Sequence, residues 1–198
     1  MIRFFDLFFS FFGLLLLSPL LIIISVLIKI TTKGPVFFKQ NRVGLFGEDF
    51  LIWKFRTMKI NSDKNGLLTV GEKDPRITNI GLILRKYKID ELPQLINVLF
   101  GTMSMVGPRP EVRKYVDLYS DEQKEVLSIL PGITDWASIK YRDENIILEK
   151  STDPEQDYIN VIMPDKKKYN MIFINNRNVI EYFKIIFNTF FRIIFPIK

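Results

Sequence analysis

The sequence of 198 residues contains no histidine and no cysteine. These absences exclude a serine–histidine–aspartate triad, a cysteine–histidine dyad, a histidine-ligated zinc site and any disulfide bond. Any catalysis therefore depends on carboxylates, lysine, arginine, tyrosine or a hard metal ion. The absence of cysteine also fits a reducing compartment.

Positive charge is in excess: 28 lysines and arginines stand against 22 aspartates and glutamates, for a net charge of +6 and a pI of about 9.4. Such a chain suits a polyanionic partner, such as nucleic acid, anionic lipid headgroups or a nucleotide. No nucleic-acid recognition motif is present, and a nucleic-acid module would not need an apolar anchor. We therefore expect no nucleic-acid partner. The length fits one or at most two domains.

Residues 7–28 form an apolar segment with no charge after Asp6. At ~1.5 Å per residue in a helix, it is long enough to cross a bilayer. A cleaved signal peptide is the first alternative, but no small-residue cleavage site precedes Lys29. The segment is therefore expected to lie in a membrane.

Ser18 and Pro19 lie at the midpoint of this segment, where proline removes a backbone donor and predicts a kink. The kink alone leaves two topologies open, a spanning helix and a re-entrant hairpin. Arg3 precedes the segment and Lys29 and Lys33 follow it. A hairpin with both ends on the cytoplasmic side satisfies all of these basic residues.

Residues 36–58 predict a β-hairpin, with a turn at residues 44–49. In the second strand Lys54 and Arg56 share one face. That face is either solvated or the phosphate-binding edge of a site. Residues 61–72 are polar and predict a loop.

Three helices are predicted outside the central part of the chain. One covers residues 80–88, capped by Thr78 or Asn79, and a charged amphipathic helix covers residues 111–130. The third, residues 178–195, is apolar with interspersed charges, which favours a helix docked on the domain or lying in the membrane interface. The predicted fold is α/β, mostly helical with a small β-hairpin.

Residues 85–111 carry the candidate site. Asp90 precedes a run of helix formers over residues 91–100, which begins with Glu91. Asp90 is therefore predicted as the N-cap of this helix, where a carboxylate stays ionised and phosphate is attracted. Arg85 lies five residues before Asp90, and Arg109 lies in a rigid Gly-Pro-Arg-Pro turn. Two guanidiniums could then hold an anion in front of Asp90. The alternative is that both acids only stabilise the start of a helix.

A second acidic pair, Asp121–Glu122, has no flanking basic anchors of this kind. We expect it to begin a helix or to lie on a solvated face.

The stretch DELPQLINVLFGTMSMVGPRPE, residues 90–111, is similar to the signature of bacterial sugar transferases, the polyprenyl-phosphate phosphoglycosyl transferases with one membrane-embedded hairpin. The similarity continues in collinear order through shorter segments and covers most of the chain to about Arg142. These segments are residues 33–40, 42–44, 54–58, 74–78 and 131–134.

The resemblance implies a role for each candidate residue. Asp90 would attack the phosphorus attached to the sugar, Glu91 would bind Mg²⁺, and Arg85 and Arg109 would hold phosphate oxygens. Lys54 and Arg56 become candidates for the same phosphate-binding edge.

The resemblance also implies a re-entrant hairpin bent at Ser18-Pro19 (residues 1–30) and a catalytic domain (residues 31–198) at the cytoplasmic face of a bacterial inner membrane. The expected substrates are a UDP-sugar and undecaprenyl phosphate, and the reaction would open assembly of a surface glycan.

Many relatives carry Gly-Trp-Ala-Gln where this chain has Asp135-Trp-Ala-Ser138. The departure is compatible with a subgroup of the family and leaves the sugar open. A different class of function also stays open: a membrane-anchored scaffold or anionic-lipid-binding module without catalysis.

Overall fold

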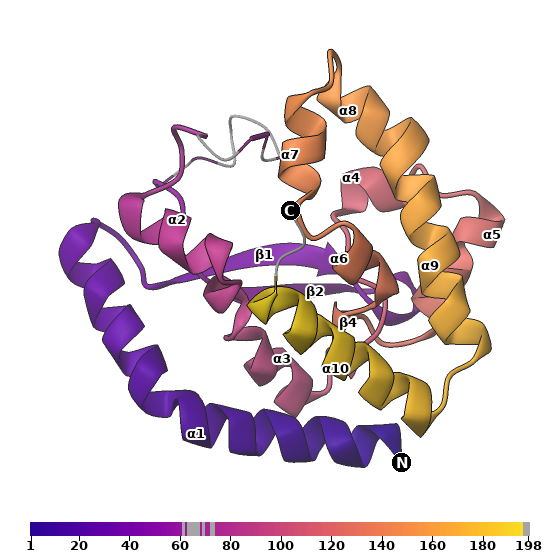
Figure 1. Ribbon diagram of the computed structural model, residues 1–198, viewed down its shortest axis with the longest axis horizontal. Helices are drawn as coiled ribbons and strands as arrows, with labels where there is room; N and C mark the ends of the chain where they lie inside the picture. The colour runs from indigo at the N-terminus through magenta and orange to yellow at the C-terminus, as the bar shows by residue number, and fades with distance from the viewer. Residues whose placement is uncertain (61, 63–67, 69, 72–73, 196–198) are drawn as a thin grey trace.

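The computed structural model describes residues 1–60, 62, 68, 70–71 and 74–195, and Figure 1 shows the arrangement of their elements. The predicted loop at residues 61–72 lies largely outside the described residues. The first half contains α1 (Ile2–Thr31), β1 (Phe37–Val43), η1 (Leu45–Gly47), β2 (Asp49–Phe55), α2 (Asn79–Lys86), η3 (Ile89–Glu91) and α3 (Gln94–Phe100). The second half contains β3 (Ser104–Val106), α4 (Arg113–Val116), α5 (Asp121–Lys124), η4 (Glu125–Ser128), β4 (Gly132–Thr134), α6 (Trp136–Lys140), α7 (Glu144–Glu149), α8 (Pro154–Asp157), the π-helical η5 (Tyr158–Ile162), α9 (Met163–Asn175) and α10 (Val179–Ile194). The chain is therefore mostly helical with little sheet, as predicted.

The predicted hairpin is confirmed. Strands β1 and β2 pair antiparallel, with Phe37 opposite Phe55. The Asn97 side chain of α3 completes the other edge of β2, because its Oδ1 accepts from the Trp53 N–H at 2.9 Å and its Nδ2 donates to the Leu51 carbonyl at 2.8 Å. The Asn97 amide thus makes the two backbone hydrogen bonds that a neighbouring strand would make, and these bonds hold α3 against the hairpin.

A second small sheet was not predicted from the sequence. Strands β3 and β4 pair in parallel, with Ser104 opposite Gly132 and Val106 opposite Thr134. Just beyond β3, a Cβ on Gly107 would lie 2.4 Å from the Leu130 carbonyl oxygen. Only glycine allows this approach of two backbones, and it fixes where the Gly-Pro-Arg-Pro turn begins.

Two of the predicted helices agree with the structure. Thr78 caps α2 by accepting from the Gly81 N–H at 3.1 Å, and Asn178 caps α10 by accepting from the Glu181 N–H at 2.9 Å.

The single helix predicted over residues 111–130 is wrong. The segment forms α4, α5 and η4 instead, because Ser120 and Gln123 make a capping box that begins a new helix. Its apolar residues still gather in one buried cluster with the π-helix η5.

Helix α1 continues through Pro19 and bends about halfway along its length (Figure 1). The Leu15 carbonyl, which residue 19 cannot bind through a backbone N–H, instead accepts from Ser18 Oγ at 2.8 Å. The predicted kink is thus a bend within one helix rather than a break between two.

Both halves of α1 pack on the same domain. In the first half, Arg3 donates to the Val98 carbonyl at 2.8 Å and to the Leu99 carbonyl at 3.3 Å, near the end of α3. In the second half, Ile24 and Ile28 are buried in a cluster with residues of β2 and α2. The bend therefore allows both halves of α1 to contact the same domain.

Asp6 provides a further anchor for the first half of α1. Its Oδ1 accepts from Ser104 Oγ at 3.0 Å, from the Met105 N–H at 2.8 Å and from the Tyr182 hydroxyl at 2.9 Å. One buried carboxylate thus joins α1, β3 and α10.

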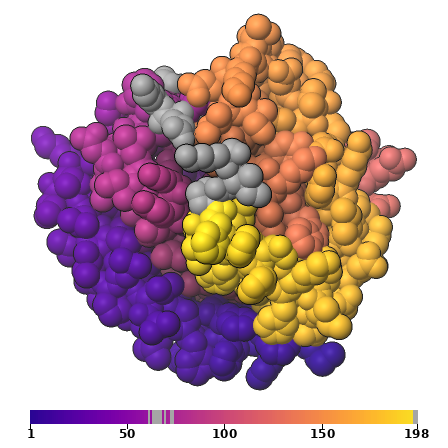
Figure 2. All heavy atoms as spheres, in the orientation of Figure 1, coloured from indigo at the N-terminus to yellow at the C-terminus, as the bar shows by residue number. Residues whose placement is uncertain are grey.

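The remaining surface of α1 is apolar and exposed, and it continues onto α10. Among the described residues, α1 is the helix that is long and apolar enough to cross a membrane. The Phe5 and Phe183 rings lie 5.0 Å apart, which places the first half of α1 beside α10. Figure 2 shows the two helices on one face of the molecule, in indigo and yellow. The exposed side chains of α10 include Ile180, Phe187, Phe190, Phe191 and Ile194.

Candidate active site

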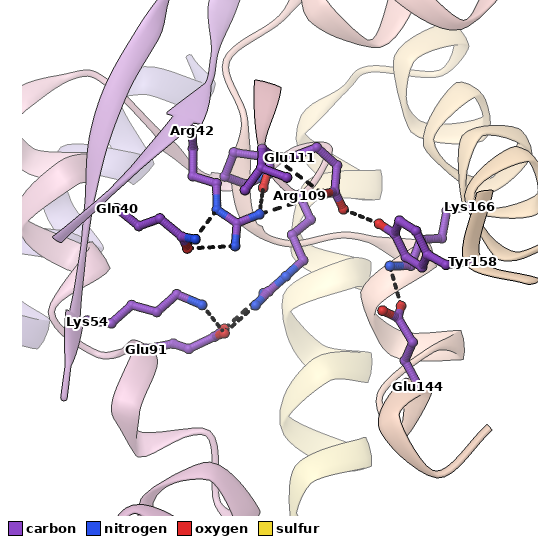
Figure 3. Close-up of polar contacts among 11 residues, drawn as sticks. Gln40, Arg42, Lys54, Glu91, Arg109, Glu111, Glu144, Tyr158 and Lys166 are labelled. Atoms are coloured by element: carbon purple, nitrogen blue, oxygen red, sulfur yellow. Dashed lines mark hydrogen bonds and ion pairs between the residues drawn. The ribbon is translucent and has the colours of Figure 1, made fainter. Parts of the chain in front are cut away.

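The candidate site lies where the β-hairpin, η3 and the turn after β3 meet (Figure 3). Strand β2 supplies Lys54, η3 supplies Asp90 and Glu91, and the Gly-Pro-Arg-Pro turn supplies Arg109. The structure thus brings together side chains from three parts of the chain that the sequence analysis had linked.

Glu91 is the centre of the ion pairs. Its Oε1 lies 2.9 Å from Lys54 Nζ and also contacts Arg109 Nη2, while Oε2 accepts from Arg109 Nη1 at 3.0 Å. Burial alone would raise the pKa of this carboxyl, but the charges of Arg109 and Lys54 outweigh burial and hold its pKa well below the usual range. Glu91 is therefore ionised and held by two cations.

The pKa of Asp90 is shifted in the opposite direction to that of Glu91. Its side chain is buried, and Oδ1 has no hydrogen-bond partner among the described residues. Burial and the adjacent charge of Glu91 raise the pKa of Asp90 to about 6, against the opposing charges of Lys54, Arg85 and Lys88. A buried carboxylate oxygen without a partner is costly, and such groups often mark a site that a ligand completes.

The prediction that Asp90 caps a helix is wrong. Asp90 lies inside the 3₁₀ turn η3, and α3 begins at Gln94, with Pro93 before it and no side-chain cap. Leu92 and Pro93 already have helical backbone angles, so the turn runs into α3. The carboxylate of Asp90 is therefore not used in holding the start of the helix.

Lys88 belongs to this site, although the sequence analysis did not select it. Its backbone has φ of 57°, a left-handed conformation that is uncommon for lysine. Burial lowers its pKa, and its charge lowers the pKa of both Asp90 and Glu91. Its position within the central stretch, two residues before Asp90, was the available signal.

Arg85 is half-buried, and burial lowers its pKa while the charge of Asp90 opposes that change. Its charge lowers the pKa of Asp90, and the predicted role of Arg85 in holding phosphate stays a prediction.

The Arg109 turn is held from both sides. The Arg109 N–H donates to Asp135 Oδ2 at 3.4 Å, and the Gly132 N–H donates to the Pro108 carbonyl at 3.0 Å. Asp135, which departs from the family pattern, is thus buried beside the turn and also caps α6 by accepting from the Ser138 N–H at 2.5 Å.

A second polar network continues from the turn toward the C-terminal helices (Figure 3). Arg42 donates to Gln40 Oε1 at 2.9 Å and lies 3.6 Å from Glu111, whose other oxygen contacts the Tyr158 hydroxyl. Sequence analysis missed these residues as site components, although Arg42 lies in a segment similar to the family. Tyr158 comes from the part of the chain to which no role was assigned.

Arg56 lies elsewhere. It is buried and donates to the carbonyls of Thr32, Lys33 and Pro35 at 2.6 to 3.2 Å, just after the end of α1. The structure therefore separates Arg56 from Lys54, and these contacts fit an anchor for the α1 connection.

The acidic pair can be compared with what Mg²⁺ requires. No group of three or more potential ligands gathers among the described residues, so there is no protein cage for a metal. Mg²⁺ commonly takes one or two carboxylates and completes its shell with substrate phosphates and water. Among the described residues Asp90 Oδ1 has no hydrogen-bond partner, whereas Glu91 contacts Lys54 and Arg109. The residues fit a Mg²⁺ ion that arrives with phosphate.

The family follows from the comparison with known sequences. The profile of the family described as bacterial sugar transferase matches residues 1–196, almost the whole chain. The protein belongs to this family, as the central stretch had indicated.

Three relatives illustrate its range. A protein of Aeromonas hydrophila named UDP-N-acetylgalactosamine-undecaprenyl-phosphate N-acetylgalactosaminephosphotransferase is 46% identical over 63% of this chain and 30% of its own length. A UDP-glucose:undecaprenyl-phosphate glucose-1-phosphate transferase of Escherichia coli K12 is 37% identical over 90% of this chain and 37% of its own length. A putative undecaprenyl-phosphate N-acetylgalactosaminyl 1-phosphate transferase of Bacillus subtilis 168 is 42% identical over 67% and 70%. The chain thus spans only about a third of the length of the first two relatives, and the named sugars differ.

Proposed function

We propose that the protein transfers a sugar-1-phosphate from a UDP-sugar to a polyprenyl phosphate such as undecaprenyl phosphate, releasing UMP. The names of the relatives support this class of substrates. The reaction would be the first membrane step in the biosynthesis of a surface glycan.

The observation that carries the proposal is the contrast between the two adjacent acids. Glu91 is neutralised by Lys54 and Arg109, whereas Asp90 keeps a buried oxygen without a partner among the described residues. A free carboxylate oxygen beside several cations can attack a phosphorus atom, because the cations attract the phosphates and offset their charge.

In the proposed first step, an Asp90 oxygen forms a bond to the phosphorus attached to the sugar, and the bond from that phosphorus to the UMP oxygen breaks. Lys54 and Arg109 would hold the phosphate oxygens. In the second step, a phosphate oxygen of the polyprenyl acceptor attacks the same phosphorus, and the Asp90 carboxylate leaves. No histidine base is needed, because a phosphate monoester is already largely ionised at neutral pH.

We include Mg²⁺ in this proposal, bound by Glu91 together with the phosphates of the donor. When bound, it would supply additional positive charge at the transferred phosphoryl group. Arg109 would then exchange Glu91 for a phosphate oxygen.

The proposed membrane topology is a re-entrant α1 with both ends on the cytoplasmic side. Its support is the packing of both halves of α1 on one domain, together with the bend at Ser18-Pro19. The exposed apolar faces of α1 and α10 would then be embedded in the same leaflet, with the site close to the headgroups.

A direct test uses the purified protein with a panel of UDP-sugars and no polyprenyl phosphate. We expect the correct UDP-sugar to release up to one equivalent of UMP and to leave a sugar-phosphate adduct on Asp90, detectable by peptide mass spectrometry. Adding undecaprenyl phosphate should discharge the adduct.

If UMP appears only after lipid is added, and velocities fit only a ternary complex, Asp90 is not a nucleophile. If no UDP-sugar gives UMP with or without lipid, a scaffold or lipid-binding role is favoured.

The topology is tested with single cysteines, for which the cysteine-free chain is suited. Cysteines introduced at Ile2 and Ile60 should both resist a membrane-impermeant reagent in intact cells. Labelling at position 2 alone would show that α1 spans the membrane. Pro19→Ala should shift the population toward spanning.

A further inference from the structure

Three basic residues connect the turn that holds Asp90 to the end of α10. Lys88 Nζ donates to the Arg142 carbonyl at 3.3 Å, and Arg142 Nη1 in turn contacts the Arg192 carbonyl. We call Lys88, Arg142 and Arg192 the cation row. The row starts two residues from Asp90 and ends on the helix whose outer face is apolar.

Arg192 is half-buried and lies on the domain-facing side of α10. It follows the fully buried Ile185 by seven residues, so the two side chains share one face of α10. The neighbouring Phe191 and Ile194 point outward and are 55% and 65% exposed. Figure 2 shows the last turns of α10 between the segment containing α2 and α3 and the segment containing α6 and α7.

One nitrogen of the Arg192 guanidinium lacks a hydrogen-bond partner among the described residues. Within the described residues Nη1 is buried without a hydrogen-bond acceptor, and no carboxylate forms an ion pair with this residue. A buried guanidinium nitrogen without an acceptor costs free energy, which an anion bound beside it would offset. In the same described part of the chain, Ser138 Oγ on the neighbouring helix α6 is also buried without a hydrogen-bond partner.

We propose that Arg192 and Lys88 form a subsite for the phosphate monoester of the lipid acceptor, separate from the Arg109 and Lys54 groups that would hold the donor. The inference rests on the proposed function and names the part of the site that receives the lipid. A lipid whose chain lies beside the apolar face of α10 in the bilayer would have to place its phosphate at the C-terminal end of this helix, where Arg192 lies in the last turn. From there the row leads to the Asp90 turn.

The test separates the two half-reactions. Arg192→Gln should raise the KM for undecaprenyl phosphate about tenfold or more, because a charge-assisted contact is lost. UMP release without lipid and the KM for the UDP-sugar should stay within about twofold of wild type, and Arg192→Lys should retain part of the acceptor affinity. Arg177→Gln, a change at an exposed arginine just before α10, is the matched control and should leave both half-reactions unchanged. Equal losses in donor and acceptor steps, or an unchanged acceptor KM in Arg192→Gln, would overturn the subsite.

A binding measurement keeps the inference testable even if no UDP-sugar reacts. In detergent micelles, farnesyl phosphate should raise the melting temperature of wild type and Arg177→Gln, whereas farnesol and inorganic phosphate should not. Arg192→Gln should lose most of this shift. If phosphatidylglycerol abolishes the farnesyl phosphate shift at equal concentration, the row binds ordinary headgroups and the acceptor subsite is wrong. Failure of UMP release together with a normal farnesyl phosphate shift would instead count against the donor chemistry alone.

Discussion

The chain contains two aspartate–glutamate pairs, Asp90–Glu91 and Asp121–Glu122, in opposite environments. Asp90 is 8% exposed and lies among basic side chains, whereas the Asp121 side chain is 98% exposed and pairs with Lys124 at 2.9 Å. The second pair begins α5, where Ser120 and Gln123 form a capping box. The same dipeptide is therefore buried among cations in one place and begins an exposed helix in the other.

Loss of the buried carboxylate should give the largest effect. Asp90→Asn removes the proposed nucleophile, and we expect sugar-phosphate transfer to fall on the order of 10³-fold or more. Asp121→Asn should leave the rate within about twofold, because an exposed carboxylate contributes little. Initial rates with a fixed UDP-sugar and undecaprenyl phosphate measure both. Comparable losses in the two variants would remove the distinction between the pairs.

Replacing the cation beside the buried pair should have the next largest effect. Arg109→Lys keeps the charge but loses the two-pronged contact, so activity should fall roughly 100-fold, with thermal stability and membrane insertion close to wild type. Lys124→Arg, at the cation beside Asp121, is the matched control and should have no effect on activity. Full activity in Arg109→Lys would count against a phosphate-binding role.

The pH dependence should also distinguish the pairs. Because the pKa of Asp90 is raised to about 6 and the nucleophile must be ionised, UMP release without lipid should fall about tenfold per pH unit below pH 6. Burial lowers the pKa of Lys54 to about 8, so a second decline is expected above pH 8. Asp121→Asn should keep the same profile. A rate that is flat from pH 5 to 7 would contradict the raised pKa of Asp90.

The protonation state of Asp90 should also affect stability, but stability favours the protonated form whereas activity needs the ionised form. Folding raises the pKa of Asp90, so the folded state favours its protonated form, and the stability this provides is lost as pH rises through 6. Asp90→Asn should therefore be more stable than wild type at pH 8, by about 1 to 3 kcal/mol, and the gain should disappear toward pH 4. Urea unfolding at several pH values measures this. A pH-independent difference would contradict it.

The smallest effect concerns the exposed pair. Ser120→Ala removes the side-chain cap of α5 and should cost about 1 kcal/mol of stability while transfer activity stays unchanged. Thermal unfolding and the transfer assay together check this. A loss of activity without a loss of stability would show that the second pair has a functional role.

Sequence patterns predicted the elements whose signals are local. The turn of the hairpin, the cap Thr78 and the amphipathic character of α10 each depend on residues close together in the chain. The site was found from a contiguous stretch with two acids and two arginines. Its neighbours Gln40 and Tyr158 were missed because they reach it from distant segments.

Two errors have the same physical origin. Lys54 and Arg56 share one strand face in the sequence pattern, but Arg56 lies just past the end of β2, where the free carbonyls after α1 compete for its guanidinium. Asp90 precedes a helix-forming run, but a 3₁₀ turn begins after Lys88, whose backbone is left-handed. Asp90 therefore lies inside that turn and not at the start of the helix. In both cases a local pattern was overridden by contacts or backbone angles that it does not encode.

The amino-acid sequence by itself determined which chemistry is available and which segment is long and apolar enough to enter a membrane. Without histidine or cysteine, reactivity rests on carboxylates and basic side chains, and residues 7–28 are too apolar for an ordinary soluble helix. Only the tertiary structure decided which carboxylate is free. Packing β2 and the Arg109 turn around η3 neutralises Glu91 with two cations and leaves one buried oxygen of Asp90 without a hydrogen-bond partner in the described residues. Burial and pairing depend on contacts between distant segments.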